Sequence, residues 1–317
     1  MFNAYRRVLP PQGNPAYNQA YEELVFRQGE GLPLLMLWRN PRAVVCGKHQ
    51  NLYGEVNVWQ AHQEGLPLIR RESGGGAVTH GPGNLNYTMV HAQEGEWDAA
   101  EFPRPIIACL RELGVDAALF DSAGISVKDF KVSGSAQRLT GGRILHHGTL
   151  LFDADIRQVD GPLRRSPYIA NCQATCSKPA PIGNIRPHLK QDMDLDAFEA
   201  YLIKRLCTDQ EPYALSDNGA VKALARSKYQ TWNWTYARSP RFDYRKDFVL
   251  QGKPWSLFFT CEKGLITQVR FAISNQDKPE LSALFAGQRL EPASLMVHAE
   301  RFFTRQMAEA LLPHFFG

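Results

Sequence analysis

The chain has 317 residues, 44% of them hydrophobic, and its 36 basic and 32 acidic side chains give a formal net charge of +4. This composition supports a large core, and so small a charge, without a Lys/Arg run, argues against a nucleic-acid-binding protein. No apolar run is long enough to span a membrane. Residues 1–11 lack the apolar segment of a signal peptide, so we expect a cytoplasmic protein.

The six cysteines are widely spread, and we expect them to be free thiols. Cys172 and Cys176 form a CxxxC pair, but no second pair of ligands accompanies them. Because structural zinc needs four ligands, we predict no zinc site here.

The first two thirds of the chain mix helices and strands. Asn14 is a candidate N-cap, with Pro15 at the first helical position of a helix over 14–28. The pair Gly141–Gly142 suits a tight hairpin turn between strands over 130–139 and 144–155. Other predicted strands cover 32–40, 42–47, 66–72 and 84–90, and other helices cover 56–65, 104–114 and 194–206, the last capped by Asp194.

These elements do not alternate as βαβ units. We therefore predict an α+β fold with a mixed β-sheet rather than a doubly wound nucleotide-binding fold. A turn-rich segment at Pro240 suggests a boundary between a larger domain over 1–238 and a small α+β domain over 244–317. In the second domain we expect strands over 243–250, 253–261 and 265–273, then helices around 278–286 and 296–312.

Three consecutive glycines, residues 74–76, interrupt two predicted strands just after Arg70 and Arg71. Glycine lets backbone amides approach an anion closely, and adjacent amides can form an anion-binding concavity. On an extended strand only one of the two arginines can face such a site. The same pattern also fits a flexible hairpin tip with solvated arginines, and it is not a standard phosphate-binding loop.

A second cluster begins at Lys131, which small residues follow in "KVSGSAQR". Small side chains next to a lysine leave room for a ligand, and the ammonium group could contact a carboxylate or phosphate. The alternative is a surface lysine on an edge strand. Further on, His146 and His147 should point to opposite faces of their strand, for packing or hydrogen bonding rather than for a metal.

The segments "RRESGGGAVTHGPGNLNY", "KVSGSAQR" and "HHGTLLFDAD", in this order, resemble the lipoate–protein ligase A family. Further similar segments are "LWRNPRAVVCGKHQN", "RSPY" and "TWNWTYARSPRF", so the resemblance covers nearly the whole chain. It implies a catalytic domain like that of biotin ligases and the class II aminoacyl-tRNA synthetase core, plus an accessory domain. It also implies a two-step reaction with ATP, Mg²⁺ and lipoate. Lipoate and Mg-ATP first give lipoyl-AMP and pyrophosphate, and a lysine of an acceptor domain then attacks lipoyl-AMP to form an amide.

The resemblance implies acceptors in the lipoyl domains of 2-oxoacid dehydrogenase complexes and in the glycine cleavage H protein. It implies site residues as well, with Lys131 as the catalytic residue. The expected nucleotide-binding residues are Arg71, Gly75, Gly76, Ala77, Val78, Thr79 and Lys131. The expected lipoate-binding residues are Arg70, Ser73, His80, Lys131, Ser133, Gly134, His147 and Gly148.

The chain departs from the family pattern at Gly81 and Gly124, where family members usually carry an acidic residue. Carboxylates near a nucleotide are typical ligands of Mg²⁺, so their loss argues against Mg²⁺ binding and adenylation by this chain. One alternative is therefore a lipoyltransferase that uses preformed lipoyl-AMP. Another is an octanoyl or lipoyl acyltransferase with a cysteine nucleophile, for which Cys172 and Cys176 are the candidates.

Overall fold

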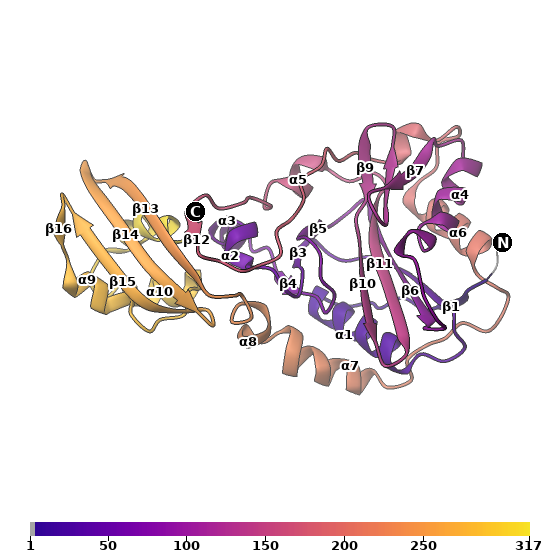
Figure 1. The fold of residues 1–317 in the computed structure, drawn as a ribbon, viewed down its shortest axis with the longest axis horizontal. Coiled ribbons are helices and arrows are strands. Elements are labelled where there is room, and N and C mark those ends of the chain that lie inside the picture. Colours follow the sequence, from indigo (N-terminus) through magenta and orange to yellow (C-terminus); the bar gives the residue numbers. More distant parts are fainter. Residues whose placement is uncertain (1–3) are drawn as a thin grey trace.

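The computed structural model describes residues 4–317, and the first three residues of the N-terminal stretch lie outside it. Figure 1 shows a larger lobe and a smaller lobe that lie side by side, with the C-terminus at their junction. The larger lobe contains three sheets.

The central sheet has the strand order β1-β2-β6-β11-β10. Its first pair is parallel and the others are antiparallel, so the predicted mixed sheet is confirmed. The turn between β10 and β11 uses Gly141 and Gly142, both with positive φ, as the hairpin prediction requires. The strands are β1 (Arg6–Val8), β2 (Leu34–Trp38), β6 (Asn84–Ala92), β10 (Ser135–Thr140) and β11 (Arg143–Leu151).

Two three-stranded sheets flank the central sheet, with orders β4-β3-β5 and β7-β8-β9. The first carries the strands on either side of the glycine-rich segment. The second is a meander whose first two strands the sequence did not predict. The single strand predicted over 130–139 is in fact two strands in different sheets, β9 and β10, which meet at Gly134. The strands of the two flanking sheets are β3 (Ala43–Cys46), β4 (Leu68–Arg70), β5 (Val78–His80), β7 (Ala117–Phe120), β8 (Gly124–Val127) and β9 (Phe130–Ser133).

Helix α1 (Pro15–Gln28) begins as predicted, because the side chain of Asn14 accepts a hydrogen bond from the Tyr17 amide at 3.0 Å. Most of α1 is buried, including the polar residues Gln19 and Glu22. The remaining helices of this lobe are α2 (Leu52–Glu55), α3 (Val58–Gln63), α4 (Arg104–Glu112), α5 (Ile156–Asp160), α6 (Leu195–Leu206), α7 (Asn218–Leu224) and α8 (Trp232–Thr235), with short turns η1 (Ala99–Glu101), η2 (Arg186–His188) and η3 (Ala225–Tyr229).

The smaller lobe is an antiparallel sheet of order β12-β13-β14-β15-β16 packed against helices. Its first strand comes from residues 169–170, so the sheet is not built from the C-terminal segment alone. The helix predicted over 296–312 is wrong: two helices occupy this region, with a break after Ala299. The elements are β12 (Ile169–Ala170), β13 (Phe242–Leu250), β14 (Lys253–Glu262), β15 (Leu265–Ile273), β16 (Gln276–Asp277), α9 (Pro279–Phe285), α10 (Pro292–Ala299), α11 (Arg305–Leu311) and η4 (Leu312–Phe315).

One apolar cluster joins the two lobes. It contains buried residues of α2 and α3 together with the inner faces of β13, β14 and β15. At its edge the rings of Trp59 and Phe316 stack with their centroids 6.2 Å apart. The lobes therefore share buried surface at the place where the sequence analysis puts a domain boundary. Within residues 4–317, no helix is both long and apolar enough to cross a membrane.

Candidate active site

A cavity of about 360 Å³ opens in the larger lobe, between the glycine-rich segment, β9 to β11 and the segment 175–178. This volume is in the range of small-molecule sites. Ten of the predicted site residues line it, namely Arg71, Gly75, Gly76, Ala77, Val78, His80, Lys131, Gly134, His147 and Gly148. The predicted residues outside its lining are Arg70, Ser73, Thr79 and Ser133.

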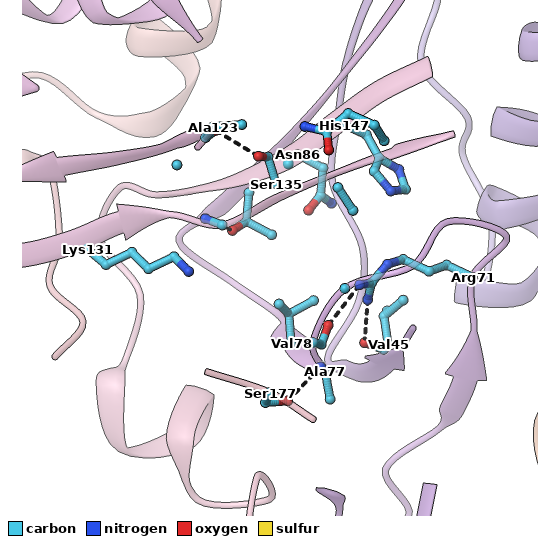
Figure 2. Close-up of a pocket in the computed structure, with 18 of the residues that line it drawn as sticks. Val45, Arg71, Ala77, Val78, Asn86, Ala123, Lys131, Ser135, His147 and Ser177 are labelled. Atoms are coloured by element: carbon cyan, nitrogen blue, oxygen red, sulfur yellow. Dashed lines mark hydrogen bonds between the residues drawn. The ribbon is translucent and has the colours of Figure 1, made fainter. Parts of the chain in front are cut away.

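The glycine-rich segment wraps around the guanidinium group of Arg71. This group donates hydrogen bonds to the carbonyls of Gly74, of Gly76 (2.8 Å) and of Val45 (3.1 Å). Gly75 has a φ of +84°, a conformation that disfavours other residues. Burial lowers the pKa of Arg71 to about 10, so the group stays charged at neutral pH. Arg71 thus shapes the loop and lines the cavity (Figure 2).

Arg70 points away from the cavity. Its side chain is completely buried and donates hydrogen bonds to the carbonyls of Gly47, Gln50 and Thr235 at 2.8–3.1 Å. The expectation that Arg70 contacts the substrate is therefore corrected. Adjacent strand residues face opposite sides, and Arg71 takes the cavity side. Arg70 instead holds the turn after β3 against α8.

The segment 175–178 covers the glycine-rich loop from the other side. The hydroxyl of Ser177 accepts hydrogen bonds from the Ala77 amide at 3.2 Å and from Gln50 Nε2 at 3.0 Å. A Cβ on Gly76 would meet Ser177 Oγ at 2.9 Å. Ser177 therefore binds the Ala77 amide, one of the backbone donors of the predicted anion-binding loop, as the dashed line in Figure 2 marks. Lys178 adds a second lysine to the lining.

Lys131 enters the cavity from β9. Its ammonium nitrogen lies 5.4 Å from the centre of the Phe120 ring. Burial lowers the pKa of Lys131, and the nearby Asp121 carboxylate partly offsets this effect. The backbone of Lys131 is fixed by hydrogen bonds with Pro181 and Gly183 at 2.8 and 3.1 Å. The charge thus stands on a rigid strand and faces the cavity.

His147 belongs to a chain of buried hydrogen bonds. Its Nδ1 lies 2.8 Å from Glu22 Oε1, and its Nε2 lies 2.6 Å from Ser73 Oγ. Ser73 Oγ also accepts a hydrogen bond from Arg71 Nε at 2.9 Å. Burial raises the pKa of Glu22, but the attraction of His147 and the hydrogen bonds from His147 and Thr88 outweigh it, so the net shift is downward. Ionised Glu22 therefore orients His147, which in turn orients Ser73 and Arg71.

The other candidate histidines differ in their surroundings. His80 lines the cavity, and burial followed by repulsion from Arg71 lowers its pKa to about 3, so it is neutral. His146 faces the opposite side of β11, where its ring stacks on Phe102 at 4.8 Å. The alternation expected for His146 and His147 is therefore present in the structure.

The cysteines and acidic groups near the cavity are few. Cys176 lines the cavity and is exposed, while burial raises the pKa of Cys172 and favours its neutral thiol. Asp121, which has a φ of +49°, is the one carboxylate among the described residues of the lining. In the part of the chain that the structure describes, no three His, Cys, Asp or Glu residues form a metal-binding group.

Several further residues line the cavity that the sequence did not single out as site residues. Some of them lie within the segments that resemble the family, while Gln19, Phe120, Asp121, Thr175 and Lys178 lie outside those segments and reach the cavity only through the fold. These further residues are Gln19, Trp38, Val45, Asn86, Tyr87, Phe120, Asp121, Ser135, Ala136, Gln137, Thr149, Thr175 and Lys178.

Comparison with known proteins shows which family the chain resembles. Residues 14–207 match the model of the lipoyl protein ligase A/B catalytic domain. The chain is 31% identical to lipoate-protein ligase LplJ of Bacillus subtilis over 88% of both chains. It is 29% identical to lipoate–protein ligase 1 of Staphylococcus aureus, over 81% of this chain and 80% of the relative.

Solved structures share the fold. P. falciparum LipL1 in complex with lipoate aligns over 95% of both chains, with a TM-score of 0.62 and 20% identity. A bipartite archaeal ligase studied with its E2 lipoyl domain, from Thermoplasma acidophilum, aligns over 74% of this chain and 97% of its own (TM-score 0.61, 23% identity). A lipoate-protein ligase A bound with ATP aligns over 73% of this chain and 98% of its own (TM-score 0.60, 24% identity).

The chain therefore belongs to the lipoyl protein ligase A/B catalytic domain family. Its activity is that of a lipoate–protein ligase, an enzyme that attaches lipoate to protein.

Proposed function

We propose that this ligase works in two steps. In the first, a lipoate carboxylate oxygen attacks the α-phosphorus of ATP, which releases pyrophosphate and leaves lipoyl-AMP. In the second, an acceptor lysine amine attacks the lipoyl carbonyl, and AMP leaves with the bonding electrons while the amine loses a proton. The names of the relatives support the reaction, and the solved structures with ATP and with lipoate support the two ligands.

The observation that carries this proposal is one cavity lined by both the glycine-rich backbone and Lys131. Amide donors and a lysine aimed at one point stabilise the charge that develops at a phosphate. We assign the nucleotide to Arg71, Lys131 and the run 75–79, with Thr79 acting from behind the lining. Lys131 also contacts the lipoyl carboxylate.

We assign the acyl chain to the part of the cavity that runs from Lys131 toward His147. Figure 2 shows these two residues on opposite sides of the cavity, with Ser135 and Asn86 between them. Trp38, Val45 and Tyr87 supply apolar walls, and Gly134 leaves room for the chain beside Lys131. Gly148 instead allows its strand to pack closely against the Tyr87 hydroxyl and the Gly134 carbonyl. The other lipoate-binding residues in this assignment are His80, Ser73 and Ser133, of which Ser73 and Ser133 act from outside the lining.

We further assign Mg²⁺ to the substrate Mg-ATP. Asp121 is the one carboxylate in the described lining, so ATP phosphates and water would supply the other Mg²⁺ ligands. The departures at Gly81 and Gly124 fit this assignment. The larger unit, 1–238, carries the chemistry, and 244–317 is the accessory unit. The expected place of action is the cytoplasm.

The proposed acceptors are the lipoyl domains of 2-oxoacid dehydrogenase complexes and the glycine cleavage H protein. The archaeal ligase studied with its E2 lipoyl domain supports this class of partner. In this proposal the acceptor lysine reaches the lipoyl carbonyl next to Lys131.

The test is incubation of the enzyme with lipoate, Mg-ATP and a lipoyl domain, followed by intact-mass measurement of the domain. We expect a gain of one lipoyl group that depends on ATP. Modification from preformed lipoyl-AMP, but not from lipoate with ATP, would show a lipoyltransferase instead. A hydroxylamine-sensitive acyl adduct on Cys176 would show a cysteine acyltransferase.

A further inference from the structure

The two histidines that line the cavity differ in how far protein groups already occupy their ring nitrogens. His147 Nδ1 donates a hydrogen bond to the Glu22 carboxylate, and its Nε2 lies 2.6 Å from Ser73 Oγ, which also accepts a hydrogen bond from Arg71. An ionised carboxylate can only accept, so His147 carries a proton on Nδ1. His147 has both ring nitrogens occupied by protein groups and offers neither to a ligand.

A second chain of hydrogen bonds determines which ring nitrogen of His80 carries the proton. It starts at the carbonyl of Arg39, which accepts a hydrogen bond from Asn18 Nδ2 at 3.3 Å. The same Nδ2 donates to Asn40 Oδ1 at 2.7 Å, which leaves Asn40 Nδ2 facing His80 Nδ1 at 2.8 Å. An amide nitrogen only donates, so Nδ1 of His80 is the acceptor. The proton of the neutral His80 ring is therefore on Nε2.

The Nε2–H group of His80 has no protein acceptor among residues 4–317. The ring lines the cavity next to the Trp38 indole, with ring centroids 6.0 Å apart. The carboxylate of Glu22, which binds His147, also interacts with His80, so His80 belongs to the part of the cavity near His147, which Figure 2 shows across from Lys131. The inner end of the acyl site thus combines aromatic walls with a free, oriented N–H donor.

We propose that His80, held by Asn40, makes this enzyme select acyl chains that carry hydrogen-bond acceptors at their far end, such as the dithiolane sulfurs of lipoate, over a plain alkyl chain such as octanoate. This inference rests on the proposed function and names the substrate preference of the same site. The sulfurs are weak acceptors and pack well against an indole ring. An octanoyl chain would cover the donor with methyl and methylene groups and leave it unpaired.

The size of the preference follows from the cost of an unpaired donor. Leaving a buried polar group unsatisfied changes binding by roughly 10-fold or more, and sites built around a donor reject analogues without an acceptor. We therefore expect kcat/KM for lipoate to exceed that for octanoate by about 10-fold. Asn40 contributes as a positioning residue, since it acts through His80.

The first test compares His80→Gln with His80→Leu, using competition between lipoate and octanoate and mass analysis of the acceptor domain. The glutamine amide keeps a donor near the Nε2 position, so most of the preference should remain. The leucine should bring the ratio close to 1, mainly through better use of octanoate. His62→Leu is the matched control on α3, where the exposed His62 lies outside this cavity. An unchanged ratio in His80→Leu would overturn the proposal.

The second test uses Asn40→Asp, which has the same shape but only accepts hydrogen bonds. At pH 8 it should draw the proton of the neutral His80 ring to Nδ1, and ¹⁵N NMR of the imidazole reports this change directly. The lipoate preference should then fall toward 1. A wild-type ring with its proton on Nδ1, or a shifted proton with an unchanged preference, would refute the inference.

These outcomes are separate from those of the proposed function. An enzyme that attaches neither acid in the presence of ATP contradicts the ligase reaction itself. An enzyme that attaches both acids equally well, in wild type and variants alike, leaves the ligase reaction standing and removes only the selectivity of His80.

Discussion

Replacing Lys131 by glutamine removes the charge at the centre of the proposed reaction while it keeps most of the side-chain length. The fold should tolerate the change. The side chain makes one cation–π contact, with Phe120, of a kind that contributes about 0.5–1 kcal/mol. The strand itself is held by backbone hydrogen bonds of Lys131 that glutamine retains.

The expected effect on adenylation is much larger. Two unit charges 4 Å apart interact by about 4 kcal/mol at an effective dielectric constant of about 20. Lys131 is partly accessible to solvent, so screening reduces this value. We therefore expect the rate of adenylation to fall by about 10²–10³-fold, which matches the usual loss of one charge-stabilising group.

The assay is lipoate-dependent exchange of pyrophosphate into ATP, with the melting temperature as a check on folding. Lys128→Gln is the matched control, because Lys128 lies on the turn before β9, is exposed and does not line the cavity. A folded Lys131→Gln variant that exchanges pyrophosphate within about threefold of the wild-type rate would refute the reasoning, since roughly 10²-fold is the least that the charge should contribute.

Three further predictions concern other parts of the site. Gly76→Val should weaken ATP binding at least about 10-fold, because its side chain meets the segment at Ser177, and unchanged affinity by calorimetry would contradict the amide cradle. Cys172→Ser and Cys176→Ser, alone or together, should retain most transfer activity, and loss of activity with loss of an acyl-enzyme adduct would contradict the anhydride route. Glu22→Gln should lower the free energy of unfolding at pH 7.5 by about 2–3 kcal/mol. The folded-state pKa of Glu22 is lowered, so the stabilisation by Glu22 is present above pH 4.5 and is lost as the pH falls through the folded-state pKa. Urea melts measure this: the unfolding free energies of wild type and Glu22→Gln should converge at low pH, and a constant difference would contradict the assignment.

The local sequence determined those elements whose signals lie within a few residues. The Asn14 cap and Pro15 predict the start of α1, and Gly141–Gly142 predicts the turn of the central hairpin. Strand alternation predicts that only one of Arg70 and Arg71 faces the site. These features depend on backbone conformation and short-range periodicity, which a sequence records directly.

Other features depended on the tertiary structure. The sequence did not predict strands β7 and β8, and it predicted one helix over 296–312 where the structure has two, because packing outweighs weak local propensities there. Which arginine points inward also follows from the neighbours, since Arg70 finds its carbonyl partners on α8 and on the turn after β3.

The polar groups behind the site are the clearest case. Glu22 lies 125 positions before His147 and Asn40 lies 40 before His80, yet each pair is joined by a hydrogen bond of 2.8 Å. On their own, a glutamate on a helix and an asparagine in a turn predict a solvated face. Only the packing of α1 and the β2–β3 turn against the cavity strands buries them, and this burial strengthens the hydrogen bonds through which Glu22 orients His147 and Asn40 orients His80.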